Sequence, residues 1–297
     1  MNQQRVRLGF MGFGEVALSF AQDLSRAGWT DIPVYSPSGA RAQPGDAISE
    51  RAAGVGVRLL RTPRELCENA DIILGLTPGR AALKALRALL PHLRERHLYA
   101  DASSAAVKTV EAQGRLMAGK AAFVDAALMG PVPLNGIKVT MVASGAHARR
   151  FHDLLTPHGF DIRVIDGKPG AASAMKLIRG VYIKGMTAVL METLEAAERY
   201  GILEETAADI AESLDKRPFM QSIKRYVCST AVHAGRRVDE MTDAIALLNA
   251  LGSSTRLTRA TRVSLREIVK LGLREKFGAR EPDAIAPVIQ AIATAGT

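Results

Sequence analysis

Residues 9–17 read GFMGFGEVA, a glycine-rich turn between an apolar run at Val6–Met11 and a helical pattern. Gly12, Gly14 and Ala17 form the pattern Gly-x-Gly-x-x-Ala. The glycines permit a tight turn and close approach of the backbone to a pyrophosphate, and the alanine permits close helix–strand packing. Free N–H groups at the helix start favour phosphate oxygens. The stretch therefore predicts a strand–turn–helix unit that binds a dinucleotide.

Strand and helix patterns alternate through the first half of the chain. After Val6–Met11, further apolar runs occur at Ile32–Tyr35, Val55–Leu60, Ala70–Leu76, His97–Ala100, Ala121–Ala127, Val139–Ser144 and Ile162–Ile165. Such alternation is typical of a mostly parallel sheet with right-handed crossovers. We therefore predict an α/β Rossmann-type domain over residues 1–166.

The second half contains no convincing strand pattern after Gly167. The stretch from Gly170 to about Tyr200 predicts one long helix that is apolar on nearly every side, so we expect it to be buried between two bodies of protein. Further helices are predicted near 204–214, 239–251 and 256–271. We thus expect an all-α C-terminal domain over residues 167–297, joined to the first domain by a long interdomain helix.

Composition limits the class of protein. A chain of 297 residues with 47% hydrophobic and 23% charged residues fits two ordinary folded domains. Cys67 and Cys228 form no disulfide framework, so we expect a reducing, cytoplasmic setting. No apolar run approaches the roughly 18 residues of a membrane span. Glu15 and three glycines interrupt the apolar N-terminal stretch, which argues against a targeting signal.

The formal net charge of +9 is compatible with solubility alone, with a small anionic ligand or with nucleic acid. Five basic residues recur at helical spacing and are interpreted as a solvated face: Arg256, Arg259, Arg262, Arg266 and Lys270. We expect a small anionic substrate and no membrane or nucleic-acid partner. No cluster of His, Asp or Glu has metal-ligand spacing. Because a domain of about 130 residues cannot bury the long helix unaided, we also predict a homodimer, the commonest oligomer.

The end of the second strand indicates the cofactor. NAD enzymes usually carry an acidic residue there for the ribose 2′-hydroxyl. Here the strand ends Tyr35-Ser36-Pro37-Ser38, with Arg41 beyond, which suits a 2′-phosphate better, so NADP is favoured over NAD. The predicted cofactor-binding residues come from the glycine turn and from the ends of the second and fourth strands: Gly9, Gly12, Phe13, Gly14, Glu15, Val16, Ser36, Ser38, Arg41, Leu76, Thr77 and Pro78.

Over nearly its whole length the chain resembles the 3-hydroxyacid dehydrogenase family, which is related to 6-phosphogluconate dehydrogenase. Gly9 matches the family's early glycine. Three further family segments are matched by Asp101-Ala-Ser103-Ser104, loosely by Phe123 to Gly130, and by Gly170 to Gly180 with Lys176 at the catalytic lysine position. The chain is more similar still to a little-characterised branch that carries Lys-x-x-Arg before Lys-Gly, here Lys176 to Gly185, and Arg-x-x-Glu-Met, here Arg237 to Met241.

The resemblance implies an NAD(P)-dependent oxidoreductase in which Lys176 is the general acid/base and Ser103 holds a substrate carboxylate. A lysine suits this role if its pKa falls from about 10.4 toward roughly 7–8. The chain departs from the family on the substrate side, since Arg179 and Gly180 replace paired asparagines and Met129-Gly130-Pro131 replaces a Ser-Gly-Gly loop. The predicted substrate-binding residues are Ser103, Ser104, Gly130, Arg179, Gly180 and Lys184.

Alternatives remain for individual residues and for the function. Ser104 also suits the N-cap of the following helix, and Arg237 is a weaker candidate for the cofactor site. The first functional hypothesis is a dehydrogenase or reductase of a small 3-hydroxy acid or its keto form. The second is an imine reductase on the same fold, against which Lys176 argues because such members usually lack the lysine. The third is a non-catalytic protein that senses a dinucleotide or binds nucleic acid.

Overall fold

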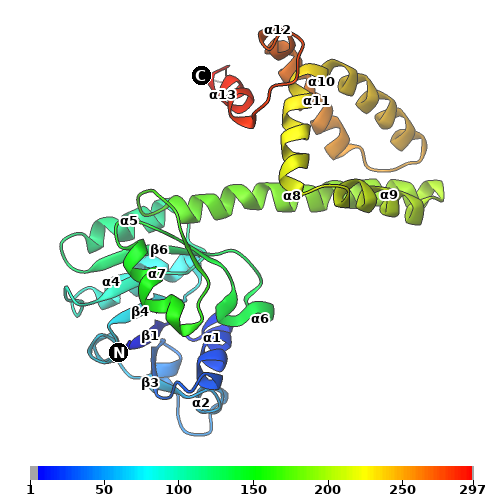
Figure 1. Ribbon diagram of the computed structural model, residues 1–297. Coiled ribbons are helices and arrows are strands. Elements are labelled where there is room, and N and C mark those ends of the chain that lie inside the picture. The colour runs from blue at the N-terminus through cyan, green and yellow to red at the C-terminus, as the bar shows by residue number, and fades with distance from the viewer. Residues whose placement is uncertain (1–5, 296–297) are drawn as a thin grey trace. The chain divides into compact units, whose positions relative to one another are not determined.

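The computed structural model describes residues 6–295, which form two compact units (Figure 1). The first unit ends at Gly180 and the second begins at Val181. The division falls within a single long helix, α8 (Ala171–Tyr200). The predicted boundary at residue 166 lies just before this helix.

The first unit is built on an eight-stranded sheet with the order β3-β2-β1-β4-β5-β6-β7-β8. All neighbouring strands are parallel except β6 and β7. The predicted Rossmann-type architecture is confirmed, and ligands bind in such sheets at the carboxyl ends of the strands. The strands are β1 (Leu8–Met11), β2 (Ile32–Tyr35), β3 (Val57–Leu60), β4 (Ile72–Gly75), β5 (Leu98–Asp101), β6 (Ala122–Leu128), β7 (Met141–Ser144) and β8 (Ile162–Val164).

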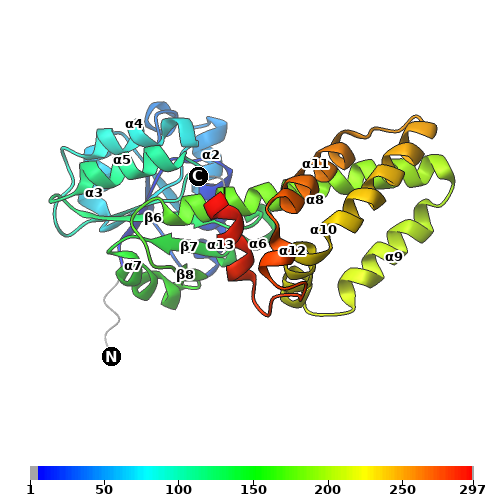
Figure 2. The same cartoon turned by 90° about the horizontal axis from the view of Figure 1, so that it is seen from above.

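Helices cover both faces of this sheet, and Figure 2 shows α3, α4 and α5 on one side and α7 on the other. Successive strand residues therefore enter different cores: Phe10 packs in one buried cluster and Met11 in the other. Burial on both faces explains why the strands are continuously apolar. The helices are α1 (Glu15–Arg26), α2 (Ala47–Ala53), α3 (Pro63–Asn69), α4 (Ala82–Leu89), α5 (Val107–Met117), α6 (Val132–Asn135) and α7 (Ala148–Leu155).

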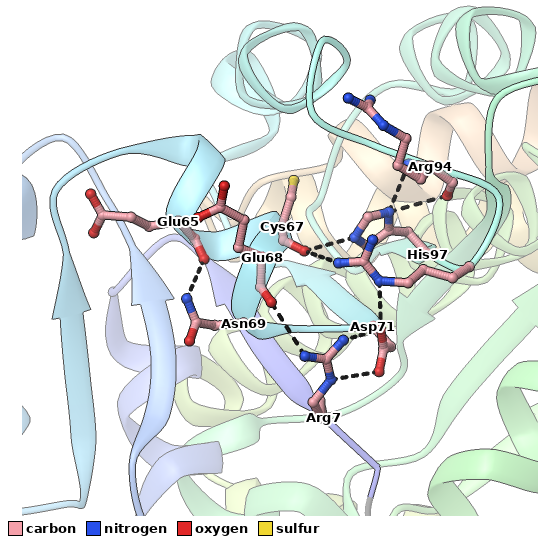
Figure 3. A network of polar contacts seen from close by, with 9 residues as sticks. Arg7, Glu65, Cys67, Glu68, Asn69, Asp71, Arg94 and His97 are labelled. Carbon is pink, nitrogen blue, oxygen red and sulfur yellow. Dashed lines mark hydrogen bonds and ion pairs between the residues drawn. The ribbon is translucent and has the colours of Figure 1, made fainter.

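A polar network ties the amino ends of β1, β4 and β5 together (Figure 3). The Asp71 carboxylate accepts hydrogen bonds from Arg7 at 2.6 and 2.7 Å and from Arg96 at 3.0 Å. The fully buried His97 imidazole donates through Nε2 to the Cys67 carbonyl at 2.8 Å. Burial raises the pKa of the Cys67 thiol to about 11, so this cysteine is no nucleophile. The network lies at the end of the strands opposite to the ligand-binding edge and stabilises the fold.

The described part of the second unit is helical throughout, as predicted. After α8 it contains α9 (Leu203–Asp215), α10 (Phe219–Ala250), α11 (Arg256–Lys270), α12 (Leu273–Lys276) and α13 (Ile285–Ala295). The predicted helix near 239–251 is only the last part of α10, which has a kink at His233. Helices α10 and α11 lie side by side (Figure 2).

The carboxylate of Glu192 joins α8 to the start of α11 within the second unit. It accepts hydrogen bonds from the backbone N–H groups of Leu257 at 3.1 Å and Thr258 at 2.9 Å and from the Ser254 hydroxyl at 2.9 Å. Partial burial raises the pKa of Glu192, but the bonds from Thr258 and its neighbours outweigh this effect and lower the pKa to about 2. Glu192 therefore supplies the N-terminal cap that α11 lacks locally.

The expectation that α8 is buried is wrong for the single chain. Ile178, Val181 and Met191 are 72%, 76% and 70% exposed. Six further large apolar residues of this helix are also exposed: Leu177, Tyr182, Ile183, Met186, Val189 and Tyr200. Across residues 6–295, no helix is long and apolar enough to cross a membrane.

Candidate functional site

The glycine turn between β1 and α1 has the backbone geometry that its sequence predicts. Gly12 has a φ of +112°, and a Cβ atom at this position would lie 2.6 Å from the carbonyl oxygen of Leu76. A Cβ atom on Gly14 would meet nothing within 4 Å, so the backbone there faces open space. No described side chain caps α1, whose first N–H groups adjoin this opening. Turn and helix start together fit a pyrophosphate.

A cavity of about 460 Å³ adjoins the turn, between the ends of β2 and β4 and helix α4. Its walls include most of the predicted cofactor residues: Gly12, Phe13, Gly14, Ser36, Ser38, Leu76, Thr77 and Pro78. The Thr77 hydroxyl oxygen is buried and has no hydrogen-bond partner within residues 6–295. An unpartnered polar atom beside an open cavity fits a site that is completed by a ligand.

The other predicted cofactor residues take different positions. Gly9 lies within β1, where a Cβ atom would be 2.8 Å from Leu66 Cδ1, so its role is to allow close packing of α3. Glu15 and Val16 lie in the first turn of α1. Arg41 is exposed on a short 3₁₀ turn after β2 and is not part of the cavity wall.

Sequence reasoning missed Lys84, which lines the same cavity from α4. Ala81, Ala85 and Ala88 line it too, and their spacing of three to four residues marks one face of a helix. This small-residue face, directly after the Thr77-Pro78 segment, is the sequence signal that identifies Lys84 as a neighbour of the cavity.

Lys176 reaches the carboxyl end of β5 from the first turns of α8. Its Nζ atom donates a hydrogen bond to Ser104 Oγ at 3.0 Å. Helix α5 begins only at Val107, with Ala106 at the N-cap, so Ser104 does not cap it. The Ser104 hydroxyl is thus available to the lysine, and the structure brings together two residues that are 72 positions apart.

Ser103 is engaged differently from its neighbour. Its hydroxyl donates to Asp101 Oδ2 at 3.1 Å, and its N–H donates to Asp101 Oδ1 at 3.3 Å. Burial raises the pKa of Asp101 to about 6, the bonds from Ser103 oppose this effect, and the nearby carboxylate of Asp125 adds to it. The buried Ser103 hydroxyl is thus bound to Asp101, whereas the exposed Ser104 hydroxyl is the one that contacts Lys176.

Asp125 holds the first turn of α8, a role that its sequence position does not reveal. Its fully buried carboxylate accepts hydrogen bonds from the N–H groups of Gly170 and Ser173 at 2.9 and 3.0 Å and from the Ser173 hydroxyl at 2.7 Å. The Ser144 hydroxyl donates to it at 3.2 Å and accepts from the N–H of Ala172 at 3.1 Å. This Asp125 clamp fixes where α8 starts, and with it the position of Lys176.

Arg179 follows Lys176 by less than one helical turn, and its guanidinium donates to the carbonyl oxygen of Met129 at 3.2 Å. Arg179 therefore reaches the loop after β6 that contains the exposed Gly130. Gly180 is the last residue of the first unit. Lys184 is exposed and belongs to the second unit, so its part in the site stays a prediction.

The weaker candidate Arg237 is engaged within α10. Its guanidinium donates to the Ser229 hydroxyl at 3.1 Å and to the Thr230 hydroxyl. Within residues 6–295, no group of three His, Cys, Asp or Glu side chains is placed to hold a metal ion.

Comparison with known proteins identifies relatives over most of the chain. The model of the domain of unknown function DUF1932 matches residues 197–268. The conserved protein MTH1747 of unknown function, whose structure revealed similarity with 3-hydroxyacid dehydrogenases, is 32% identical, with a TM-score of 0.61 over 89% of this chain and 98% of that chain. A conserved hypothetical protein from Sinorhizobium meliloti 1021 is 29% identical, with a TM-score of 0.63 over 89% of this chain and 88% of that chain.

Imine reductases share the fold at lower identity. The enzyme from Myxococcus stipitatus gives TM-scores of 0.77 for a variant in complex with NAD⁺ and 0.73 for a complex with NADP⁺, both at 17% identity. These alignments cover 97% and 96% of this chain and 100% and 99% of the imine reductase chains. The fold is therefore one shared by NAD(P)-binding dehydrogenases and imine reductases.

Proposed function

The chain belongs to the family of conserved proteins represented by MTH1747, and from this premise we propose that it is an NADP-preferring oxidoreductase that acts on a small anionic alcohol or its carbonyl form, such as a 3-hydroxy acid. The observation that carries the proposal is the hydrogen bond of 3.0 Å between Lys176 Nζ and Ser104 Oγ at the carboxyl end of β5. A chain that only sensed a dinucleotide would not need a lysine at this place.

The segment that carries Ser104, the partner of Lys176, contacts the loop that lines part of the cofactor cavity. Pro78 lines the cavity, and a Cβ atom on the next residue, Gly79, would lie 2.4 Å from the carbonyl oxygen of Ser104. The loop after β4 therefore touches the segment that carries the partner of Lys176. A substrate placed between this loop and α8 has a proton-transfer group on one side and the cofactor site on the other.

A bound nicotinamide dinucleotide supplies the hydride acceptor or donor of the reaction. The Lys176 amine takes the proton from the substrate hydroxyl during oxidation and returns it to the carbonyl oxygen during reduction. The Ser104 hydroxyl orients the amine and binds the same substrate oxygen. Arg179 cannot exchange protons at physiological pH, so its role is to bind a carboxylate or another anionic group of the substrate.

The test is a screen of hydroxy acids, sugar acids and phosphonates with NAD⁺ and NADP⁺, together with their carbonyl forms and a cyclic imine with NADH and NADPH. Turnover of at least one anionic alcohol or carbonyl compound, lost in Lys176→Ala, is the expected result. Turnover of the imine alone, undiminished in Lys176→Ala, would instead identify an imine reductase. Tight cofactor binding without turnover of any compound would contradict the enzymatic proposal.

We further propose that α8 is covered by a second copy of the chain. Its apolar side chains Ile178, Val181 and Met191 are 70–76% exposed, and exposed apolar patches on a folded protein mark interaction surfaces. Symmetric dimers are the commonest way to bury such a surface. Light scattering is expected to give twice the chain mass of 31.8 kDa at micromolar concentration. A stable monomer under these conditions would disprove this assembly, and Val181→Glu is expected to shift a dimer toward monomer.

A further inference from the structure

We propose that Lys84 supplies the positive charge that binds the 2′-phosphate of NADP, so that helix α4 determines the choice between NADP and NAD. The inference rests on the proposed cofactor site and deepens it. It assigns cofactor preference to a residue that is 43 positions beyond Arg41, the cation that the sequence offers at the end of the second strand.

Among the described residues that line the cavity beside the glycine turn, Lys84 is the one with a charged side chain. None of these residues is a carboxylate that could bind a ribose 2′-hydroxyl as the acidic residue of NAD enzymes does. The negative charge of a phosphate would pair with the positive charge of the Lys84 ammonium group. Within residues 6–295, Lys84 has neither an ion-pair nor a hydrogen-bond partner, so binding a phosphate would break no existing contact.

The surroundings of Lys84 leave room for a nucleotide. Ala81, Ala85 and Ala88 line the same side of the cavity as Lys84, and their small side chains leave space for an adenosine. Ser38 is exposed at the other side, and its hydroxyl can donate a hydrogen bond to the phosphate that Lys84 pairs with. Cation and hydroxyl thus line one cavity from two different elements.

The residues of the loop after β2 are less suited to supply the charge. The Ser36 hydroxyl accepts a hydrogen bond from the Gly39 N–H at 3.0 Å and so supports the turn itself. Arg41 lies outside the cavity wall. Arg61 donates to the carbonyl oxygens of Ala40 and Ala42 at 2.8 and 3.2 Å, so its guanidinium stabilises the conformation of this loop.

The experiment compares binding, without turnover, of NADPH, NADH, 2′,5′-ADP and AMP to the full-length protein by calorimetry or fluorescence. Lys84→Ala is expected to weaken NADPH and 2′,5′-ADP by roughly 10-fold to 100-fold, as for loss of a hydrogen bond to a charged group. NADH and AMP are expected to change less than about threefold. Lys84→Arg should restore the preference. Arg87→Ala, an exposed cation on the same helix outside the cavity wall, is the matched control.

Two outcomes would overturn the proposal. Equal weakening of NADPH and NADH in Lys84→Ala would mean that Lys84 contacts the adenosine and not the phosphate. An unchanged preference in Lys84→Ala, with the preference lost in Arg41→Ala, would assign the phosphate to the loop after β2. Failure of the proposed cofactor site looks different, because the wild-type protein would then bind none of the four compounds. Failure of the enzymatic proposal would leave binding intact and show only as absence of turnover.

Discussion

The buried carboxylate of Asp125, on β6, accepts both the backbone N–H and the hydroxyl of Ser173, at 3.0 and 2.7 Å. Ser173 lies in the first turn of α8, and Lys176 follows it by three residues. The helix that carries the proposed acid/base is therefore attached to the sheet at its first turn. Movement of α8 by an ångström would separate Lys176 from Ser104, a scale of misplacement that can cost about 100-fold in rate.

Asp125→Ala is expected to destabilise the protein strongly, because four donors lose a buried acceptor: the N–H of Gly170, the N–H and hydroxyl of Ser173, and the Ser144 hydroxyl. Leaving such donors unsatisfied costs about 1–3 kcal/mol each. Ser173→Ala removes one hydroxyl bond and is expected to cost only about 1 kcal/mol. Denaturant unfolding measures both changes. If the double variant showed simple additivity of the two single effects, the direct coupling between the two side chains would be refuted.

Lys176→Ala is expected to lower kcat by about 10² to 10⁴, the usual contribution of a positioned acid/base. Cofactor affinity should be almost unchanged. Lys176→Arg keeps the charge but cannot exchange protons, so it should be as inactive as the alanine variant. The measurement is single-turnover kinetics with the best substrate of the screen. If Lys176→Ala keeps more than about a tenth of kcat when chemistry is rate-limiting, Lys176 is not the acid/base and Lys184 becomes the residue to test.

Arg179→Asn tests the anion site separately from the proton-transfer step. We expect a higher KM for an anionic substrate, or a change of preferred substrate, with a smaller effect on kcat. Hydrogen bonds to charged groups contribute about 1.5–3 kcal/mol, so the expected rise in KM is of the order of 10-fold or more. An unchanged KM for every anionic compound would show that Arg179 serves only its contact with Met129.

The sheet and the glycine turn were predictable because their signals are local. Ile32–Tyr35 forms β2 over the predicted residues, and α8 ends at the predicted Tyr200. The first half of α10 was not predicted, because its buried residues include small or polar ones such as Ser222 and Ala231, which produce little hydrophobic periodicity. Helix α3 was missed as well, although Thr62-Pro-Arg-Glu65 has the capping-box sequence pattern and the Thr62 hydroxyl accepts the N–H of Glu65 at its start.

The candidate site was only partly predictable for a different reason. Lys176 and Ser104 were each identified from a motif, but their contact depends on where α8 starts. That start depends on Asp125, which lies 48 residues before Ser173 and has no periodic relation to it. The burial of α8 was overestimated for a related reason. A helix that is apolar on every side must have its surface covered, but the sequence pattern does not show whether the same chain provides the cover.

Gly12→Ala and Gly14→Ala form a matched pair that separates folding from cofactor binding. At Gly12 the new Cβ would meet a backbone oxygen at 2.6 Å and the φ of +112° would be strained, so we expect a loss of stability of about 1–3 kcal/mol or more. At Gly14 there is open space and an extended backbone, so stability should change by less than about 1 kcal/mol.

Cofactor affinity should nevertheless fall at least tenfold in Gly14→Ala, because the added methyl group occupies the space through which a pyrophosphate approaches the backbone. Thermal unfolding and a titration with NADPH measure the two quantities on the same samples. A Gly14→Ala variant that binds NADPH as tightly as the wild type would place the pyrophosphate elsewhere.

Asp101 is expected to make the stability of the protein depend on pH. Burial raises the pKa of this carboxyl from 3.8 to about 6 in the folded protein. Between these pH values the folded protein holds a proton that the unfolded chain releases, so stability decreases as the pH rises through this window. Asp101→Asn removes the titration, its carbonyl oxygen can still accept the Ser103 N–H, and its amide group can donate to the Ser103 hydroxyl. We therefore expect the variant to gain stability over the wild type as the pH rises from about 4 to about 6, by about 2–3 kcal/mol in all.

Asp71 provides a control of opposite sign. Its hydrogen bond to Arg7, the larger effect, outweighs partial burial and lowers the pKa of Asp71, so its contribution to stability is present near neutral pH and is lost on acidification. Asp71→Asn should therefore cost stability at pH 7 and progressively less as the pH falls below 4. Denaturant unfolding of the three proteins between pH 3 and pH 8 measures these differences. A constant difference between Asp101→Asn and the wild type over this range would mean that Asp101 is ionised in the folded protein as readily as in the unfolded chain.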